Sequence, residues 1–130
     1  MTGLAAAYPR SGRAVGVIHF GLGAFHRGHQ AVYFDDALRG DLGEWGSYGI
    51  SPRSATVTDI LRKQQFLYTV NARQGEHQDP RVVASIFNGS VFDIDNPQLS
   101  AALISPELKL ITITVTEKAY VSGIEGVSMP

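Results

Sequence analysis

Apolar and polar positions alternate in blocks along the chain, and the first blocks predict strand, helix and strand in turn. The apolar run 14–20 ends at Gly21, which is typical of a buried parallel strand. From Arg27 to Leu38 apolar residues recur at helical spacing, and Gly40 is placed to end that helix. Residues 45–51 then predict a second strand.

The middle of the chain predicts a second helix followed by a hairpin. Residues 55–63 carry apolar side chains in helical register, with Ser54 as their N-cap. The runs 66–72 and 81–87 are rich in β-forming residues, and the polar segment 74–80 connects them. This pattern predicts an antiparallel hairpin inserted into the alternation of strands and helices.

The last third predicts one more helix and one more strand. Asn96 and Pro97 suit the N-cap and first position of a short helix that runs through Ile104. Residues 108–115 give the strongest strand signal in the chain. The whole order predicts an α/β fold, a Rossmann-like and mostly parallel sheet with helices on both faces and an inserted antiparallel hairpin.

Composition narrows the classes of protein to which this fold could belong. The chain has 130 residues, enough for one domain, and its net charge of -1 gives no electrostatic reason to expect nucleic acid. No apolar run reaches the length of a transmembrane helix. The sequence has no cysteine, which excludes disulfides, thiolate catalysis and zinc–thiolate sites and makes a cytoplasmic location the default.

The chemistry suggested by the residues begins at the turn Gly21-Leu22-Gly23. It follows a predicted strand and precedes a predicted helix, the context in which a glycine-rich turn binds the pyrophosphate of a dinucleotide. His26 stands where the full G-x-G-x-x-G pattern has its third glycine, so an ordinary strand-to-helix turn stays open. Arg27 could add charge-assisted bonds to a phosphate or substrate, or could be a solvated surface arginine.

Histidines surround this turn. His26 and His29 are three residues apart and could face one side of a helix, with Asp35 and Asp36 as the nearest acids. A metal site is the minor interpretation, and a histidine that lines a cofactor cleft or caps the helix is favoured. His19, on an apolar strand, is expected to be a buried histidine with satisfied hydrogen bonds.

The end of the second predicted strand is where a dinucleotide-binding fold reads the adenosine ribose. A carboxylate there would bind the 2′-hydroxyl of NAD, but residues 51–54 contain none. Arg53 could accommodate the 2′-phosphate of NADP, stack on adenine, or serve only as a turn residue. The residues therefore leave the choice between NAD and NADP open.

Four stretches, in the same order as here, resemble the mannitol dehydrogenase family of long-chain polyol-specific dehydrogenases, which includes mannitol 2-dehydrogenase and fructuronate reductase. They are His19–Gln30, Trp45–Arg53, Phe66–Thr69 and Thr112–Tyr120. The resemblance implies an oxidoreductase that moves hydride between a nicotinamide cofactor, NAD or alternatively NADP, and a sugar alcohol or keto-uronate. It also implies that the glycine turn lines the cofactor and that residues 116–118 approach the nicotinamide ribose. The candidate cofactor-binding residues are Gly21, Leu22, Gly23, Ala24, Phe25, His26, Arg27, Arg53, Thr116, Glu117 and Lys118.

The resemblance also limits what this chain is expected to do alone. The family's second, mostly helical domain carries a catalytic lysine with asparagine and histidine partners, and nothing here matches that set. Lys118 belongs to a different motif, so we expect no catalytic residue and no turnover from this chain. The expected partners are a small polyol or uronate substrate and that second helical domain, with no nucleic acid and no membrane.

These expectations divide the chain into a flexible leader, 1–13, a dinucleotide-binding domain, 14–120, and a truncated or irregular tail, 121–130. Two other functions remain as hypotheses. A non-catalytic nucleotide-binding or regulatory module would bind a nucleotide at the glycine turn and have no enzymatic activity. A purely structural α/β domain would neither bind a nucleotide nor catalyse a reaction.

Overall fold

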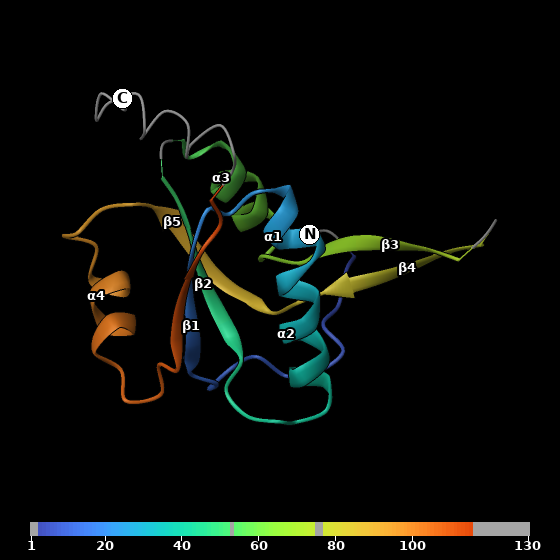
Figure 1. Ribbon diagram of the computed structural model, residues 1–130, viewed down its shortest axis with the longest axis horizontal. Coiled ribbons are helices and arrows are strands. Elements are labelled where there is room, and N and C mark those ends of the chain that lie inside the picture. The colour runs from blue at the N-terminus through green and yellow to red at the C-terminus, as the bar shows by residue number, and fades with distance from the viewer. Residues whose placement is uncertain (1–2, 53, 75–76, 116–130) are drawn as a thin grey trace, which may run out of the picture.

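The computed structural model describes residues 3–52, 54–74 and 77–115, and the side chains of 72–78 are not described. Figure 1 shows the helices and strands that these residues form. They are β1 (Val15–Phe20), α1 (Ala24–Gly28), α2 (Gln30–Arg39), β2 (Gly46–Ser51), α3 (Thr56–Lys63), β3 (Tyr68–Gln74), β4 (His77–Val83), β5 (Ile86–Val91), α4 (Pro97–Ile104) and β6 (Leu110–Ile113).

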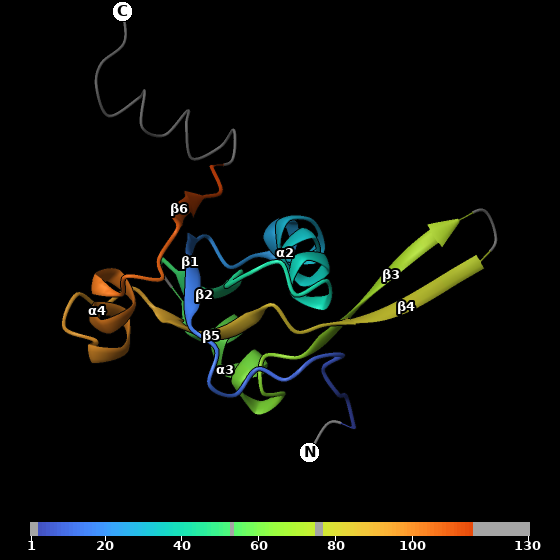
Figure 2. The same cartoon turned by 90° about the horizontal axis from the view of Figure 1, so that it is seen from below.

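Four strands form one parallel sheet in the order β5-β2-β1-β6. In chain order this is the 3-2-1-4 arrangement of a Rossmann half, in which ligands bind outside the carboxyl ends of the strands. Figure 2 shows α4 on one face of the sheet and α2 and α3 on the other. The predicted α/β fold with helices on both faces is confirmed. Among the described residues, no helix is both long and apolar enough to cross a membrane.

The two central strands are buried because helices cover both of their faces. On the α4 face, Ile18, Tyr48 and Ile50 pack against Leu99 of α4. On the other face, a cluster joins the sheet to α2, α3 and the start of β3. It contains Leu22, Ala31, Leu61, Phe66, Tyr68, Val83 and Ile86. All six residues of β2 are buried, as expected for a central strand of a parallel sheet that is covered on both faces.

The helix predicted from Arg27 to Leu38 is two helices in the structure. α1 begins three residues earlier, at Ala24, and the helix breaks at His29, whose φ of -126 and ψ of -81 are not helical. The prediction relied on apolar spacing, which marks only the part that packs on the sheet through Ala31 and Leu38. α1 carries no such stripe, so its start left no periodic signal.

The antiparallel hairpin is confirmed, but its strands differ from the predicted ones. β4 includes residues 77–80, which were expected to form a polar connection. The predicted run 81–87 is split, because the chain leaves the hairpin at Val83 and enters the parallel sheet at Ile86. The ribbon of β3 and β4 projects away from the sheet in Figure 2, so its outer part is not constrained to alternate apolar and polar residues.

The remaining elements follow the sequence closely. Ser54 Oγ accepts a hydrogen bond from Thr56 N, although the residue at the N-cap position of α3 is Ala55. Asn96 caps α4 by accepting from Gln98 N, with Pro97 in the first turn, as predicted. The final strand is shorter than expected, since β6 covers only Leu110–Ile113 of the predicted 108–115.

The N-terminal segment packs against the domain, which differs from the flexible leader that the sequence suggested. Tyr8 is buried in a cluster with Leu38, Leu67 and Ala84. Its hydroxyl donates a 2.5 Å hydrogen bond to Asp35 Oδ1. This segment therefore anchors α2 from the side opposite the sheet edge where ligands are expected.

Candidate functional site

The glycine turn between β1 and α1 is held at the carboxyl edge of the sheet. Gly21 N and Leu22 N both donate to Ile50 O, at 2.8 and 3.3 Å, which ties the turn to β2. Gly21 has a φ of +105, and a Cβ placed there would lie 3.2 Å from Thr114 Cβ. Leu22 is buried in the core, so only the residues after it are available to a ligand. Gly21 is thus a structural requirement of the turn.

Gly23 has a different role, because its backbone is unstrained and its surroundings are open. Its φ of -108 and ψ of -173 suit any residue, yet no atom lies within 4 Å of a Cβ built there. No side chain among the described residues caps α1, and its first turn contains no acidic residue. A bare backbone at an uncapped helix start fits the approach of a pyrophosphate, which is what the second glycine of a dinucleotide turn allows.

Arg27 lies in α1 next to this opening. Tyr68 Oη donates 2.8 Å to the Arg27 carbonyl, which anchors the backbone of α1 to the start of β3. The Arg27 Nε is buried without a hydrogen-bond partner, and no carboxylate of the described chain forms a salt bridge with its guanidinium. Its positive charge therefore has no compensating carboxylate within the described chain.

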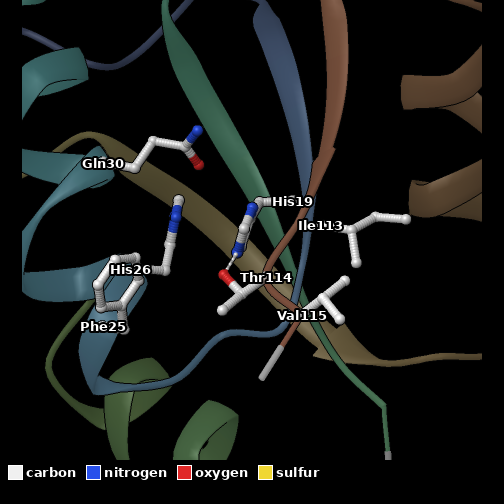
Figure 3. Close-up of a pocket in the computed structure, with 7 residues that line it drawn as sticks. All are labelled: His19, Phe25, His26, Gln30, Ile113, Thr114 and Val115. Carbon is white, nitrogen blue, oxygen red and sulfur yellow. Dashed lines mark hydrogen bonds between the residues drawn. The ribbon is translucent and has the colours of Figure 1, made fainter. Parts of the chain in front are cut away.

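Two histidine rings stack beside the turn (Figure 3). The rings of His19 and His26 are 3.6 Å apart between centroids and within 9° of parallel. His19 is satisfied: its Nδ1 pairs with Thr112 Oγ1 at 2.6 Å, and its Nε2 with Thr114 Oγ1 at 2.9 Å and the Gly21 carbonyl at 3.2 Å. The expectation of a buried, satisfied histidine at position 19 is confirmed.

His26 is buried but unsatisfied. It is 1% exposed, and neither ring nitrogen has a hydrogen-bond partner among the described residues. Burial is the main reason that its pKa falls to about 4, and the nearby His19 and Arg27 act in the same direction. The Gln30 amide opposes this shift without forming a bond of hydrogen-bond geometry with the ring. Burial also lowers the pKa of His19. Both rings are therefore neutral at physiological pH.

A cavity of about 290 Å³ opens next to these rings, between α1 and α2 on one side and the end of β6 on the other. In Figure 3, His19, His26 and Thr114 lie close together, with Gln30 of α2 above them. The residues that line the cavity are His19, Phe25, His26, Gln30, Ile113, Thr114 and Val115. Because Thr114 also contacts Gly21, the cavity adjoins the glycine turn.

The remaining predicted contacts lie outside the described residues. These are Arg53, Thr116, Glu117 and Lys118. The chain enters both segments from the carboxyl ends of β2 and β6, and Thr114 N donates 3.0 Å to the Phe20 carbonyl at the end of β1. The described part thus brings together Gly21 through Arg27, among which the side chains of Leu22 and His26 are buried.

The histidines and acids considered as metal ligands lie in separate interactions. The His29 Nδ1 pairs with the Phe25 carbonyl at 2.9 Å. Asp35 lies in a buried network with Tyr8 and arginines on α2 and β4. Within the residues that the structure describes, no three histidine, aspartate or glutamate side chains gather as metal ligands would.

A match to a family model decides between the ordinary strand-to-helix turn and the dinucleotide-binding fold that the glycine turn alone left open. The model of the mannitol dehydrogenase Rossmann domain matches residues 15–123. The chain belongs to the mannitol dehydrogenase family. The match covers the turn, the histidine stack, the cavity and the hairpin, so the features described above lie within this Rossmann domain.

Individual relatives agree with the family match. The chain is 32% identical to mannitol 2-dehydrogenase of Cereibacter sphaeroides over 95% of its own length and 27% of that protein. It is 33% identical to D-mannonate oxidoreductase of Escherichia coli K12, over 80% of this chain and 22% of the relative. A solved mannitol 2-dehydrogenase of Pseudomonas fluorescens, a ternary complex with NAD and D-mannitol, is 31% identical with a TM-score of 0.77, over 88% of this chain and 24% of that one. The chain thus spans about a quarter of the length of the relatives it matches.

Sequence reasoning identified the turn but did not assign Gln30 and Thr114 to the site. Gln30 follows His26 by four residues, a helical spacing, but the break at His29 hides that relation from a simple periodic reading. Thr112 and Thr114 alternate with Ile111 and Ile113 along β6, and this alternation was the available signal that two hydroxyls face one side.

Proposed function

We propose that this chain is the dinucleotide-binding part of an NAD-dependent oxidoreductase that acts on a sugar alcohol or a keto-uronate. The observation that carries the proposal is the open backbone at Gly23, at the carboxyl edge of the sheet. Arg27 follows in α1, and no carboxylate of the described residues compensates its charge. The solved relative with NAD supports the cofactor, and the relatives' names support the two substrate classes. The absence of cysteine supports a cytoplasmic location.

The residues present would divide the binding between them. The backbone of Gly23 and the first turn of α1 would hold the pyrophosphate, with Arg27 compensating its charge. When bound, the cofactor would accept or donate the hydride. The turn fixes its position, because Gly21 and Leu22 are bonded to β2. Arg53 would contact the adenosine end, and Thr116, Glu117 and Lys118 the nicotinamide ribose.

We further propose that turnover needs residues beyond this chain. Proton transfer to or from the substrate hydroxyl requires a group within hydrogen-bond reach. No lysine lines the described cavity. Both ring nitrogens of His19 are hydrogen-bonded to threonines, and both ring nitrogens of His26 are buried. The isolated chain should bind dinucleotide weakly. It should neither oxidise mannitol or arabinitol nor reduce fructuronate.

The proposal is tested by replacing the open glycine. Gly23→Ala should leave the melting temperature unchanged and weaken NAD⁺ binding roughly tenfold or more, because the new methyl group occupies the space that the phosphates need. Titration calorimetry against NAD⁺ and NADP⁺ measures the effect and the cofactor preference.

Gly40→Ala is the matched control. Gly40 also flanks a helix with an ordinary φ of -85, and its added Cβ would make only normal contacts at 3.5 Å or more, far from the turn. Its affinity for NAD⁺ should equal that of the wild type. Equal affinities for all three proteins would contradict the assignment of the turn. Tight binding of adenine nucleotides without preference for the nicotinamide forms would favour a regulatory module.

A further inference from the structure

The last strand of the parallel sheet has an edge that the described residues leave open. β6 pairs with β1 on one side and has no described strand on the other. Residues 110–115, with the sequence LITITV, contain no charged residue, no proline and no glycine. Exposed strand edges are normally blunted by charges, proline or bulges, because their free N–H and C=O groups pair with any strand that they meet. The edge of β6 lacks charge and proline, so it is suited to pairing with another strand.

The opposite edge of the sheet and the hairpin show such protection. β5 is the other edge strand, and two arginines occupy its carbonyls. The Gly89 carbonyl accepts from Arg62 Nη2 at 2.6 Å, and the Ile86 carbonyl accepts from Arg10 Nη1 at 3.4 Å. In the hairpin, β4 contains Pro80, which has no N–H to donate. Within the described sheet, the unprotected edge is therefore that of β6.

An apolar strip borders this edge on the face of the sheet that carries α4. In Figure 3, Ile113 points away from His19, toward the side on which α4 lies. Ile111 and Ile113 are 49% and 65% exposed. On β1, Phe20 is in register with Ile113, and its ring lies 5.9 Å from that of Phe92 between centroids. Phe92 is itself 48% exposed, so the strip extends from the edge across the neighbouring strand.

A second copy of this chain is the partner that fits both the edge and the strip. Strand pairing needs another free edge, and within the described sheet β6 is the strand that offers one. A two-fold axis perpendicular to the sheet at Thr112 brings two β6 strands together in antiparallel pairing. Such an axis keeps the faces of the sheet matched, so Ile111 of one copy comes opposite Ile113 of the other. Because residues 110–115 carry no charge, the pairing brings no like charges together.

The size of this surface sets the strength expected of the dimer. A standard specific interface buries roughly 800 Å² of each partner. An edge of six residues is about 20 Å long, and the exposed isoleucines flank it on one face. A surface of this length corresponds to a small interface, and small interfaces are typical of weak and reversible association.

We propose that the outer edge of β6 is an interface at which two copies of this chain pair antiparallel, so that the sheet continues across a two-fold axis. The proposal goes beyond the proposed function, because the pairing requires no bound dinucleotide. β6 also carries Thr114, which packs against Gly21, so the strand that forms the interface supports the glycine turn as well.

Sedimentation velocity on the chain of 130 residues tests this pairing. The wild type should pass from monomer to dimer over roughly 1–100 μM, the range expected of a small interface. Over the same range, amide hydrogen exchange should slow in β6 and stay unchanged in β5, because arginines already occupy the edge of β5.

Three substitutions locate the interface. Ile113→Lys should raise the dissociation constant roughly tenfold or more, because the pairing brings the two lysines close together across the axis. Ile60→Lys is the matched control, since Ile60 is 52% exposed on α3, which Arg62 links to the opposite edge of the sheet. It should dimerise like the wild type. Ile113→Thr keeps a β-branched side chain and should weaken the dimer by a smaller factor.

The melting temperatures of the three variants, measured where all are monomeric, should match that of the wild type because both isoleucines are exposed. If Ile113→Lys does not fold, the weaker dimer of Ile113→Thr decides the question. A wild-type chain that stays monomeric up to about 1 mM would overturn the proposal and show that another occupant, such as a following segment of a longer chain, covers the edge. A dimer that neither substitution of Ile113 weakens, or open-ended aggregates in place of a dimer, would overturn it as well.

Discussion

At the scale of single residues, the buried carboxylate of Asp35 accepts hydrogen bonds from four other residues. It is 0% exposed and accepts from Tyr8 Oη, Ala84 N, Arg39 Nε and Arg81 Nη2. Burial raises its pKa, but these hydrogen bonds outweigh that effect and hold the pKa below its usual value. One side chain thus joins the N-terminal segment, α2 and the hairpin.

Asp35→Asn should lower the free energy of unfolding by about 3 kcal/mol, because it removes the charge that two arginines and a tyrosine compensate. Chemical denaturation measures this loss. Asp36→Asn is the matched control. Among the described residues the Asp36 carboxylate pairs with Arg81 alone, and it is half exposed, so its loss should cost less than about 1 kcal/mol. Equal effects of the two substitutions would contradict the central role of the buried carboxylate.

The neutral state of His26 gives a pH dependence of stability. Its pKa is about 4 in the folded chain and 6.5 when unfolded, so between these values the unfolded chain binds the extra proton. Stability should therefore fall as the pH drops from about 6.5 to about 4, by up to roughly 3 kcal/mol. Denaturation midpoints across this range measure the slope. His26→Phe should flatten it, leaving the smaller contribution of His19; an unchanged slope would show that other groups cause it.

At the scale of elements, the sequence predicts the helices and strands that pack on the core. It does not predict the parts of elements that face the site or project from the domain. The parallel strands and α4 were predictable because burial and capping leave local signals, such as Asn96-Pro97 at the start of α4. The start of α1 and the polar part of β4 were not, because neither needs an apolar stripe. The same reason explains why Gly23 was found by its motif, while Gln30 emerged only from the three-dimensional arrangement.

The close packing of Leu22, in the turn after β1, against β2 and β5 gives a prediction at this scale. A Cβ on Gly49 of β2 would lie 2.6 Å from Leu22 Cδ1, and Gly89 of β5 faces the same leucine. Gly49→Ala should cost about 1–3 kcal/mol through overpacking and displace the glycine turn, which Leu22 anchors. The melting temperature and NAD⁺ affinity should fall together. A stable variant with full affinity would show that the turn does not depend on this packing.

At the scale of the whole molecule, the described parts of the candidate site lie at one edge of the sheet, and the hairpin projects elsewhere (Figure 2). The fold class and the cofactor turn could be predicted from the sequence, because they need only local patterns and one motif. The substrate could not, since the chain spans about a quarter of the length of its relatives.

The central claim, that a dinucleotide binds at the glycine turn, is tested most directly by following backbone amide resonances during titration with NAD⁺. The account predicts the largest shifts at Gly23 through Arg27 and at Thr114, with α4, on the opposite face of the sheet, unchanged. Shifts confined to α4 or the hairpin, or none at the turn with millimolar NAD⁺, would contradict it.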